Sequence, residues 1–580
     1  MCGIGGIIYN KSQDISIDKL DIIRDVQHMR GPDSSNHITG DRFGFTHNRL
    51  SIIDLSETGS QPMTINDWVI TYNGEIYNYQ ELRDLLELDG IVFNGTSDTE
   101  VLLSLIVHKG IDETLKLING IFAFCVYNKN TNEFYLVRDR LGLKPLFYYM
   151  DKHDNLYFAS NPSAIVKCLP EVDWELDKVA LWEYFSLGGI FTHRTLFMNI
   201  NRLDSGSIMS RSGISKYWTP TFQLHVTNDE MKTEIRSAIM SRTIADVPTV
   251  MFLSGGVDSS AVAAVIKDLD AVHLISEEAG SAQAVADLFD MNLKVVEPSY
   301  FDISTVLLEY AEFSGEPTMA GFIPYIISKE ISQEYKVAIS ANGADELFFG
   351  YNRIPTPNIP DSFFESRMKI SNININKPSL NPDNHIHEIF RHKDNFSIPI
   401  LNPDLCPSVS DLIDHELETF DTDLFSDSAM YRWIELMTYI KGDLNNTLDF
   451  ASMCNSLEVR CPFLDYKLVE KALSIDDINH ITSKNGRKHY IKEILHEENV
   501  PKHIWERSKV GFSLISEYMD SIESLKSNAT SILEDEGYLK IHCKSGNIGR
   551  DLSYLKSASL GFLHWKEVWI DSGIVKNNNI

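Results

Sequence analysis

Short apolar runs alternate with helix-like stretches between residues 247 and 340, and this alternation limits the fold more than any other feature of the sequence. The runs at 247–253, 271–275, 294–296 and 336–340 have the length and composition of buried strands. The stretches 261–269 and 282–289 between them are typical of helices. Strands that alternate with helices form parallel sheets. We therefore expect a doubly wound parallel-sheet domain in this part of the chain.

The residues before this region have a different pattern of apolar and polar residues. Short β-like runs at 3–8, 68–73, 121–127, 134–138 and 156–159 are separated by Gly, Asn and Asp, a pattern typical of a layered antiparallel domain. A polar passage at 204–246 ends in a helix-like stretch, 231–243. We predict an amino-terminal domain over 1–205, a linker over 206–230 and a second domain over 231–580. Within the second domain, 352–425 is rich in Asn, Pro and Asp and predicts a loop-rich insertion, and 430–580 is mostly helix-like.

Charge and composition exclude several classes of protein. The 580 residues carry 52 Lys and Arg against 82 Asp and Glu, a formal net charge of −30, which disfavours nucleic-acid binding. No apolar stretch approaches the ~18 residues that a membrane span requires, and no basic segment precedes the first apolar residues, so we expect a cytoplasmic protein without membrane contact. The seven cysteines are scattered without a Cys-x-x-Cys pair, which argues against structural zinc and against a disulfide framework.

Cys2 directly follows the initiator methionine. Removal of that methionine would leave an α-amino group beside the thiol, and this amine, with an ordinary pKa of about 7.7–8.0, can act as the general base for the nucleophile. A thiolate that attacks a side-chain amide needs hydrogen-bond donors for the developing oxyanion. Asn73 and Gly74 in YNGEIYN could supply a side-chain amide and a main-chain N–H. Considered alone, Cys2 is equally explained as a small buried apolar residue, and Asn73-Gly74 as a hairpin turn.

Three charged residues complete this first constellation. Arg49 could pair bidentately with the α-carboxylate of an amino-acid substrate, although a surface ion pair would explain it equally well. Glu75 and Asp98 could bind the substrate ammonium group.

These residues lie in motifs that follow one another in a characteristic order: MCGIGG, RGPDSS (30–35), HNRLSIIDLS (47–56), QPM (61–63), YNGEIYNY (72–79), SDTE (97–100), NGIFAF (119–124) and RDRLGLKPLFY (138–148). Over about residues 1–200 the chain resembles the N-terminal-nucleophile glutaminase domain of class II glutamine amidotransferases. The resemblance implies a layered αββα domain in which Cys2 hydrolyses glutamine to glutamate and ammonia. It also implies that Asn73 and Gly74 form the oxyanion hole and that Arg49, Glu75 and Asp98 hold glutamine. Met29 departs from the usual histidine.

The second constellation is SGGVDSS (254–260), placed between an apolar strand and a helix. Glycines there let main-chain N–H groups approach a phosphate chain at a helix N-terminus, serine hydroxyls add donors, and Asp258 suits a magnesium ion that bridges the phosphates. The residues in these roles are Ser254, Gly255, Gly256, Ser259 and Ser260. The Walker motif G-x-x-x-x-G-K-[ST] is absent, and by itself this loop would fit a helix N-cap equally well.

A further strand end, SANGADELFFGY (340–351), strengthens the nucleotide interpretation, because open α/β sheets bind ligands at the carboxyl edge. Asp345 is there the natural second magnesium ligand. With SLEVRCPFLD (456–465), GRKHYIKEIL (486–495) and RSKVGF (507–512), the chain over about 230–520 resembles the synthetase domain of glutamine-hydrolysing asparagine synthetase. The resemblance implies a pyrophosphatase-type ATP loop that adenylates a carboxylate. It places Leu253, Ser340 and Ala341 beside the nucleotide, and Lys488 beside the pyrophosphate leaving group and the intermediate.

Departures from that family bear on the acceptor. Asn342 stands where the family has a glutamate associated with the acyl-adenylate, and an amide cannot accept a proton as a carboxylate does. SEEAGSAQ (276–283) is shorter than the usual segment, and Phe450 replaces an arginine. We expect glutamine, ATP with Mg²⁺, and aspartate as the small-molecule partners. An enzyme that amidates or cyclises a different carboxylate, a non-catalytic regulatory homologue and a homodimer all stay open.

Overall fold

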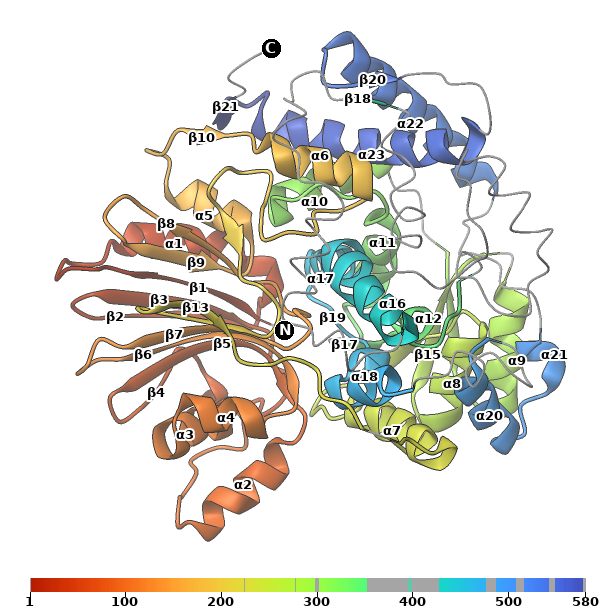
Figure 1. Cartoon of the computed structure of the whole chain (residues 1–580), viewed down its shortest axis with the longest axis horizontal. Helices are drawn as coiled ribbons and strands as arrows, with labels where there is room; N and C mark the ends of the chain where they lie inside the picture. Colours follow the sequence, from red (N-terminus) through yellow and green to blue (C-terminus); the bar gives the residue numbers. More distant parts are fainter. Residues whose placement is uncertain are drawn as a thin grey trace.

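The computed structural model describes most of the chain (Figure 1). The described residues are 2–223, 225–276, 278–297, 302–351, 396–397, 427–475, 487–506, 516–541 and 548–576. The insertion predicted at 352–425 lies outside the described residues except for β18 (Phe396–Ser397). The whole motif RSKVGF (507–512) also lies outside them.

Two six-stranded antiparallel sheets form the amino-terminal domain. The first has the order β11-β8-β9-β1-β3-β2, with β1 (Gly3–Ile8), β2 (Ser34–Thr39), β3 (Phe43–Arg49), β8 (Phe147–Met150), β9 (Leu156–Ala159) and β11 (Asn201–Arg202). The second has the order β13-β12-β7-β6-β5-β4, with β4 (Met63–Ile65), β5 (Trp68–Ile76), β6 (Gly120–Asn128), β7 (Phe134–Arg138), β12 (Ser207–Ser210) and β13 (Gly213–Lys216). The chain leaves this sheet only after Lys216, later than residue 206, at which we placed the start of the linker.

Helices cover the outer faces of both sheets, so the domain has the expected four layers (Figure 1). Over the first sheet lie α1 (Ile17–Val26) and α5 (Pro162–Cys168), and over the second lie α2 (Tyr79–Leu88), α3 (Asp98–Lys109) and α4 (Ile111–Leu117). Because both faces of the sheets are covered, β1 and β3 are buried at every position. β1 consists only of isoleucine and glycine, whereas β3 also buries the polar residues Thr46 to Arg49.

A five-stranded parallel sheet is the centre of the second domain, as the alternation of strands and helices predicts. Its order is β16-β15-β14-β17-β19, with β14 (Thr249–Phe252), β15 (Asp270–Leu274), β16 (Leu293–Val296), β17 (Val337–Ile339) and β19 (Glu458–Arg460). All four neighbouring pairs are parallel. The chain runs outward from β14 to β16 and then returns to the other side of β14, so the switch point at which such sheets bind ligands lies between β14 and β17.

Helices surround the parallel sheet and make up most of the carboxyl-terminal region, as expected. Those between its strands are α8 (Val257–Val265), α9 (Ala279–Phe289), α10 (Ile303–Ser314), α11 (Phe322–Ile331) and α12 (Ala344–Leu347), preceded by α7 (Asn228–Ser241). Later in the chain come α16 (Asp427–Glu435), a π-helix (Leu436–Leu444), α17 (Asn445–Met453), α18 (Tyr466–Leu473), α20 (His489–Glu497), α21 (Lys502–Trp505), α22 (Ser516–Asp535) and α23 (Ile548–Trp569).

The carboxyl-terminal end of the described chain returns to the amino-terminal half. β21 (Val575–Lys576) pairs in parallel with β10 (Trp174–Glu175), and α6 (Lys178–Leu187) packs on α23, while β20 (Lys540–Ile541) pairs with β18. Among the described helices, none combines the length and the apolar character that crossing a membrane demands.

Candidate functional site: two sites on one chain

Cys2 lies immediately before β1 and is 8% exposed. Its main-chain N–H donates a hydrogen bond to Oδ1 of Asn73 at 2.9 Å, which links it to β5 of the other sheet. The Nδ2 group of Asn73 is buried and makes no hydrogen bond within the described part of the chain. A buried donor without an acceptor is costly, so this amide is suited to receive an oxygen from a bound molecule. Burial raises the pKa of the Cys2 thiol, whereas the main-chain N–H of Leu50 and the Arg49 guanidinium act in the opposite direction.

Gly74 follows Asn73 and has a backbone that only glycine adopts readily, with φ of 153°. A Cβ atom at this position would lie 2.1 Å from the main-chain oxygen of Ile121 on β6. The strand therefore passes so close to its neighbour that no side chain fits. Asn73 and Gly74 are thus held beside Cys2, the residue that precedes β1.

Arg49 ends β3, and its guanidinium is oriented by the loop that follows. Nη1 donates to the main-chain oxygen of Ser56 at 2.8 Å, and Nη2 donates to that of Asp54. Gly59 packs against the guanidinium so tightly that a Cβ there would lie 2.1 Å from Nη2. Arg49 is therefore fixed near Cys2, with two of its donors engaged by the protein itself.

The two acids expected to hold an ammonium group differ in their surroundings. Asp98 begins α3, and its Oδ2 accepts from the Tyr72 hydroxyl at 2.8 Å and from the N–H of Ile76 at 3.0 Å. Glu75 is buried and forms an ion pair at 3.3 Å with Nη2 of Arg460, which belongs to β19 of the other domain. Burial raises the pKa of Glu75 well above its ordinary value, although Arg460 opposes this rise. A role for Glu75 in glutamine binding stays a prediction.

The second site is a cavity of about 680 Å³ at the carboxyl ends of β14 and β17, the switch point of the parallel sheet. Ten of the predicted residues line it: Leu253, Ser254, Gly256, Asp258, Ser259, Ser340, Ala341, Asn342, Asp345 and Lys488. Gly255 and Ser260 are not among the lining residues. Gly255, with φ of 71°, faces α9, where a Cβ would lie 2.5 Å from the Ala282 nitrogen, and Ser260 is fully buried in α8.

Hydrogen bonds of its own serines hold the loop before α8 together. The hydroxyls of Ser254 and Ser259 lie 3.0 Å apart, and the N–H of Gly256 donates to Ser254 Oγ at 3.2 Å. Gly256 is the N-cap residue of α8, so the amino end of this helix faces the cavity. Unpaired N–H groups and the helix dipole favour a negatively charged group there.

Lys488 joins the two predicted magnesium ligands. It precedes α20 in a left-handed conformation, with φ of 62°, and its ammonium contacts the carboxylates of Asp258 and, at 2.5 Å, of Asp345. Burial lowers the pKa of Lys488, but the two carboxylates outweigh it and hold the pKa above its ordinary value.

The two carboxylates come from two strand ends and reach one position, which fits Mg²⁺ bound by one or two carboxylates together with phosphates. Among the described residues, no group of three or more Asp, Glu, His or Cys side chains is placed so that it could hold a metal ion, so the phosphates would have to supply the remaining ligands.

Several residues that line the cavity were not predicted from the sequence. Tyr351 donates to Glu346 Oε1 at 2.6 Å, and burial raises the pKa of this glutamate to about 7. The π-helix and α17 contribute Tyr439, Leu444, Thr447 and Leu448. Tyr351 and Glu346 lie in the quoted SANGADELFFGY motif, whereas no local signal marks the α17 residues. Asn342 lines the same cavity, and its Oδ1 accepts from Ser340 Oγ at 3.0 Å.

Phe450, the departure noted in α17, faces the amino-terminal domain. It is fully buried, with its ring stacked 6.2 Å from that of Phe147. Here an aromatic contact occupies the position at which the family has a charge.

Comparison with known proteins agrees with this division. Residues 1–218 match the family model for the glutamine amidotransferase domain, and residues 230–564 match that for asparagine synthase. The chain is 31% identical over 563 residues to asparagine synthetase (glutamine-hydrolysing) 1 of Bacillus subtilis, covering 88% of this chain and 87% of the relative. It is 29% identical to asparagine synthetase (glutamine-hydrolysing) 3 of the same organism, covering 82% and 81%. Amidase chyE of Penicillium rubens is 26% identical, covering 81% and 82%.

The fold and the paired sites define a glutamine amidotransferase domain joined to a second, parallel-sheet domain with a nucleotide-type loop. The chain belongs to the family of glutamine-hydrolysing asparagine synthetases.

Gly74→Ala should lower glutamine hydrolysis by about 100-fold, because a shift of the strand by the width of a methyl group misplaces the oxyanion donors. Glutamate release measures this. Gly110→Ala is the matched control, since Gly110 also has a left-handed backbone, with φ of 80°, but no atom lies within 4 Å of its Cβ position. Equal losses in both variants would contradict a specific role for the close approach at Gly74.

Proposed function

We propose that the protein hydrolyses glutamine at Cys2 and uses the ammonia to amidate a carboxylate that ATP has activated, with aspartate as the acceptor and asparagine as the product. The observation that carries this proposal is the cavity in which Asp258, Asp345 and Lys488 converge, on the same chain as the Cys2–Asn73 pair. Membership of the family supports both half-reactions.

In the first half-reaction, the Cys2 thiol attacks the side-chain amide of glutamine. Removal of Met1 supplies an α-amine as the base, which a buried thiol of raised pKa requires. The Nδ2 group of Asn73 and the N–H of Gly74 stabilise the oxyanion, and Arg49 and Asp98 hold the amino-acid end. Collapse of the adduct releases ammonia, and water then frees glutamate from the thioester.

In the second half-reaction, the loop 254–260 binds the phosphates of ATP, and the acceptor carboxylate attacks the α-phosphorus to give an acyl-adenylate and pyrophosphate. Asp258 and Asp345 would hold Mg²⁺, which neutralises phosphate charge. Lys488 donates to the leaving pyrophosphate, and Leu253, Ser340 and Ala341 border the nucleotide. Ammonia displaces AMP to form the amide. Because free ammonia is mostly protonated at neutral pH, we infer that it passes between the sites inside the molecule.

Cys2→Ala should abolish glutamine-dependent product formation and leave ammonium-dependent formation intact, because the nucleophile serves only to generate ammonia. Product formation with each nitrogen source measures this, and the intact mass should show that Met1 has been removed. A mature protein that retains Met1 and still hydrolyses glutamine would contradict the free-amine mechanism.

Asp258→Asn and Asp345→Asn should each lower ATP-dependent pyrophosphate release by about 100-fold, because each variant removes a charge expected at the metal-bound phosphates. Glutamine hydrolysis without ATP is the internal control and should stay close to that of the wild type. A parallel loss of both activities would indicate a folding defect instead.

A second acceptor class is favoured by two observations. Asn342 lines the cavity at the position where the family resemblance implies a glutamate, and one relative of similar length, from Penicillium rubens, is named an amidase. On this alternative, the same chemistry amidates or cyclises another carboxylate, and Asn342 contributes to its recognition through hydrogen bonds.

An acceptor screen separates the two possibilities. If aspartate is the acceptor by the ordinary mechanism, pyrophosphate release should depend on aspartate, and Asn342→Glu should maintain or raise it, since a general base contributes about 10²–10⁴-fold. If another acid is the acceptor, the new buried carboxylate should weaken its binding. Strong aspartate turnover in the wild type that collapses in Asn342→Glu would contradict the first possibility as we state it.

A further inference from the structure

A guanidinium from the second domain holds one oxygen of Glu75. Arg460, the last residue of β19, is completely buried, and its Nη2 lies 3.3 Å from Oε1 of Glu75 on β5. Its Nε and Nη1 groups bind its own domain. Nε donates to Glu458 at 2.5 Å, and Nη1 donates to the main-chain oxygens of Arg242 and Ile244 at 2.9 and 2.6 Å. Because the guanidinium is a rigid planar fork, these bonds fix the direction in which Nη2 meets Glu75.

The other oxygen of Glu75 is suited to a ligand. Oε2 is buried and makes no hydrogen bond within the described part of the chain, which is costly for a carboxylate unless a bound molecule supplies a donor. Burial raises the pKa of the Cys2 thiol, and the charge of Glu75 adds to this rise, so the carboxylate lies within electrostatic reach of the nucleophile.

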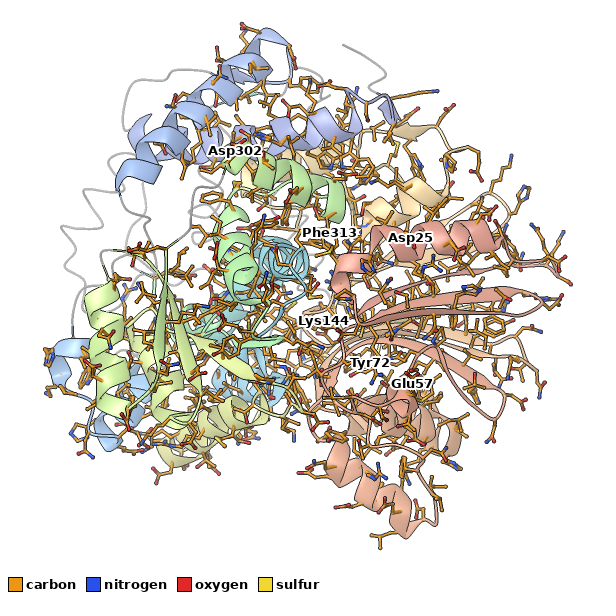
Figure 2. The ribbon with its side chains drawn as sticks, turned by 180° about the vertical axis from the view of Figure 1, so that it is seen from behind. Asp25, Glu57, Tyr72, Lys144, Asp302 and Phe313 are labelled. Atoms are coloured by element: carbon orange, nitrogen blue, oxygen red, sulfur yellow. The ribbon has the colours of Figure 1, made fainter. Side chains whose placement is uncertain are left out.

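Asp98 supplies a second carboxylate in the same place. Burial is the largest cause of the raised pKa of Glu75, and the charge of Asp98 adds to it, so the two acids lie close together. Asp98 is anchored by the hydroxyl of Tyr72, which Figure 2 shows in the amino-terminal domain near its boundary with the second domain. Neighbouring buried carboxylates favour a cation between them, and an ammonium group has three donors to share.

We propose that Arg460 is a positioning residue that acts through Glu75, because it holds Oε1 and thereby presents Oε2 to the α-ammonium group of glutamine. The second domain then completes the amino-acid end of the amino-terminal site, and the site selects side-chain amides that carry a free α-amino group. The inference rests on the proposed function, since it takes Cys2 as the glutaminase nucleophile and Glu75 as a ligand of the substrate.

The test compares two amides in the full-length wild type and in Arg460→Lys. One is glutamine, and the other is glutaric acid monoamide, which is glutamine without its α-amino group. Ammonia release in the absence of ATP measures the hydrolysis of both. The wild type should prefer glutamine by about 10⁴-fold in kcat/KM, because a buried site built to bind a polar group rejects the analogue that lacks it.

Arg460→Lys should raise the KM for glutamine by about 10- to 100-fold and keep kcat within about threefold of the wild type. The reason is that lysine lacks the fork that holds Glu75, while Cys2 and its oxyanion donors stay in place. Hydrolysis of the monoamide, which offers no ammonium group to Glu75, should stay within about twofold of the wild type. A merely structural role of Arg460 would slow the hydrolysis of both amides alike.

The matched control is Arg242→Lys. Arg242 is a buried arginine of the same region, but its Nη1 pairs with Asp465 at 2.6 Å rather than with Glu75, and only its main-chain oxygen contacts Arg460. This variant should keep the preference for glutamine even if it melts at a lower temperature.

A second variant covers the case in which Arg460→Lys does not accumulate as folded protein. Glu458→Met combined with Arg460→Met removes both charges of the pair within β19, and apolar side chains of similar volume often replace a buried ion pair without loss of stability. Because nothing then holds Glu75, the double variant should show the same selective rise in the KM for glutamine.

Three outcomes would overturn the proposal. They are an equal loss of activity toward both amides in Arg460→Lys, an unchanged preference for glutamine in that variant or in the double variant, and a loss of the preference in Arg242→Lys. Failure of the proposed function looks different, since the wild type would then release no Cys2-dependent ammonia from glutamine.

Discussion

Buried ion pairs across the domain boundary fix how the two sites of this protein face each other. Arg30 with Asp449, Glu75 with Arg460, and Arg202 with Glu316 each join one domain to the other with little or no exposure to water. Such pairs contribute little net stability, but removing one partner costs about 3–5 kcal/mol because the other charge is left buried. A relative placement of the domains that separates any of these pairs is therefore strongly disfavoured.

Two elements of the second domain contribute to both sites at once. The main-chain oxygen of Arg460 accepts from the N–H of Ser340 at the cavity, at 2.9 Å, while its guanidinium pairs with Glu75 beside the Asn73–Gly74 strand. α17 also contributes to both sites, since Leu448 lines the cavity and Asp449 pairs with Arg30. Figure 1 shows α17 between the two antiparallel sheets and the parallel sheet. Elements that form the wall of the nucleotide cavity therefore also contact the surroundings of Cys2 and of the Asn73–Gly74 strand.

The sequence predicts local features of this structure well. Strand and helix periodicity reveals the parallel sheet, and the glycine and serine pattern of 254–260 locates the loop at its carboxyl edge. Within that loop it cannot tell that Gly255 turns toward α9 and that Ser260 points into the core, because these directions depend on how α9 packs.

Long-range partners are also beyond local patterns. Glu75 lies in a motif typical of ligand binding, yet its charge is paired with Arg460, which the sequence places far along the chain. β19 has only three residues, and two of them, Glu458 and Arg460, are charged, so it gives no strand signal of its own. The pairing of Arg30 with Asp449 likewise cannot be predicted locally, because it depends on how the two domains pack against each other.

The proposed function requires that nitrogen pass from Cys2 to the acyl-adenylate inside the molecule. The most direct measurement supplies glutamine carrying heavy nitrogen in its side-chain amide, together with ATP, the acceptor and an excess of unlabelled ammonium, and determines the isotope in the amide product. Internal transfer predicts product that carries almost only the heavy isotope while glutamine is saturating. Product in which the label is diluted in proportion to the added ammonium would contradict it, because the ammonia would then have mixed with the solvent before reacting.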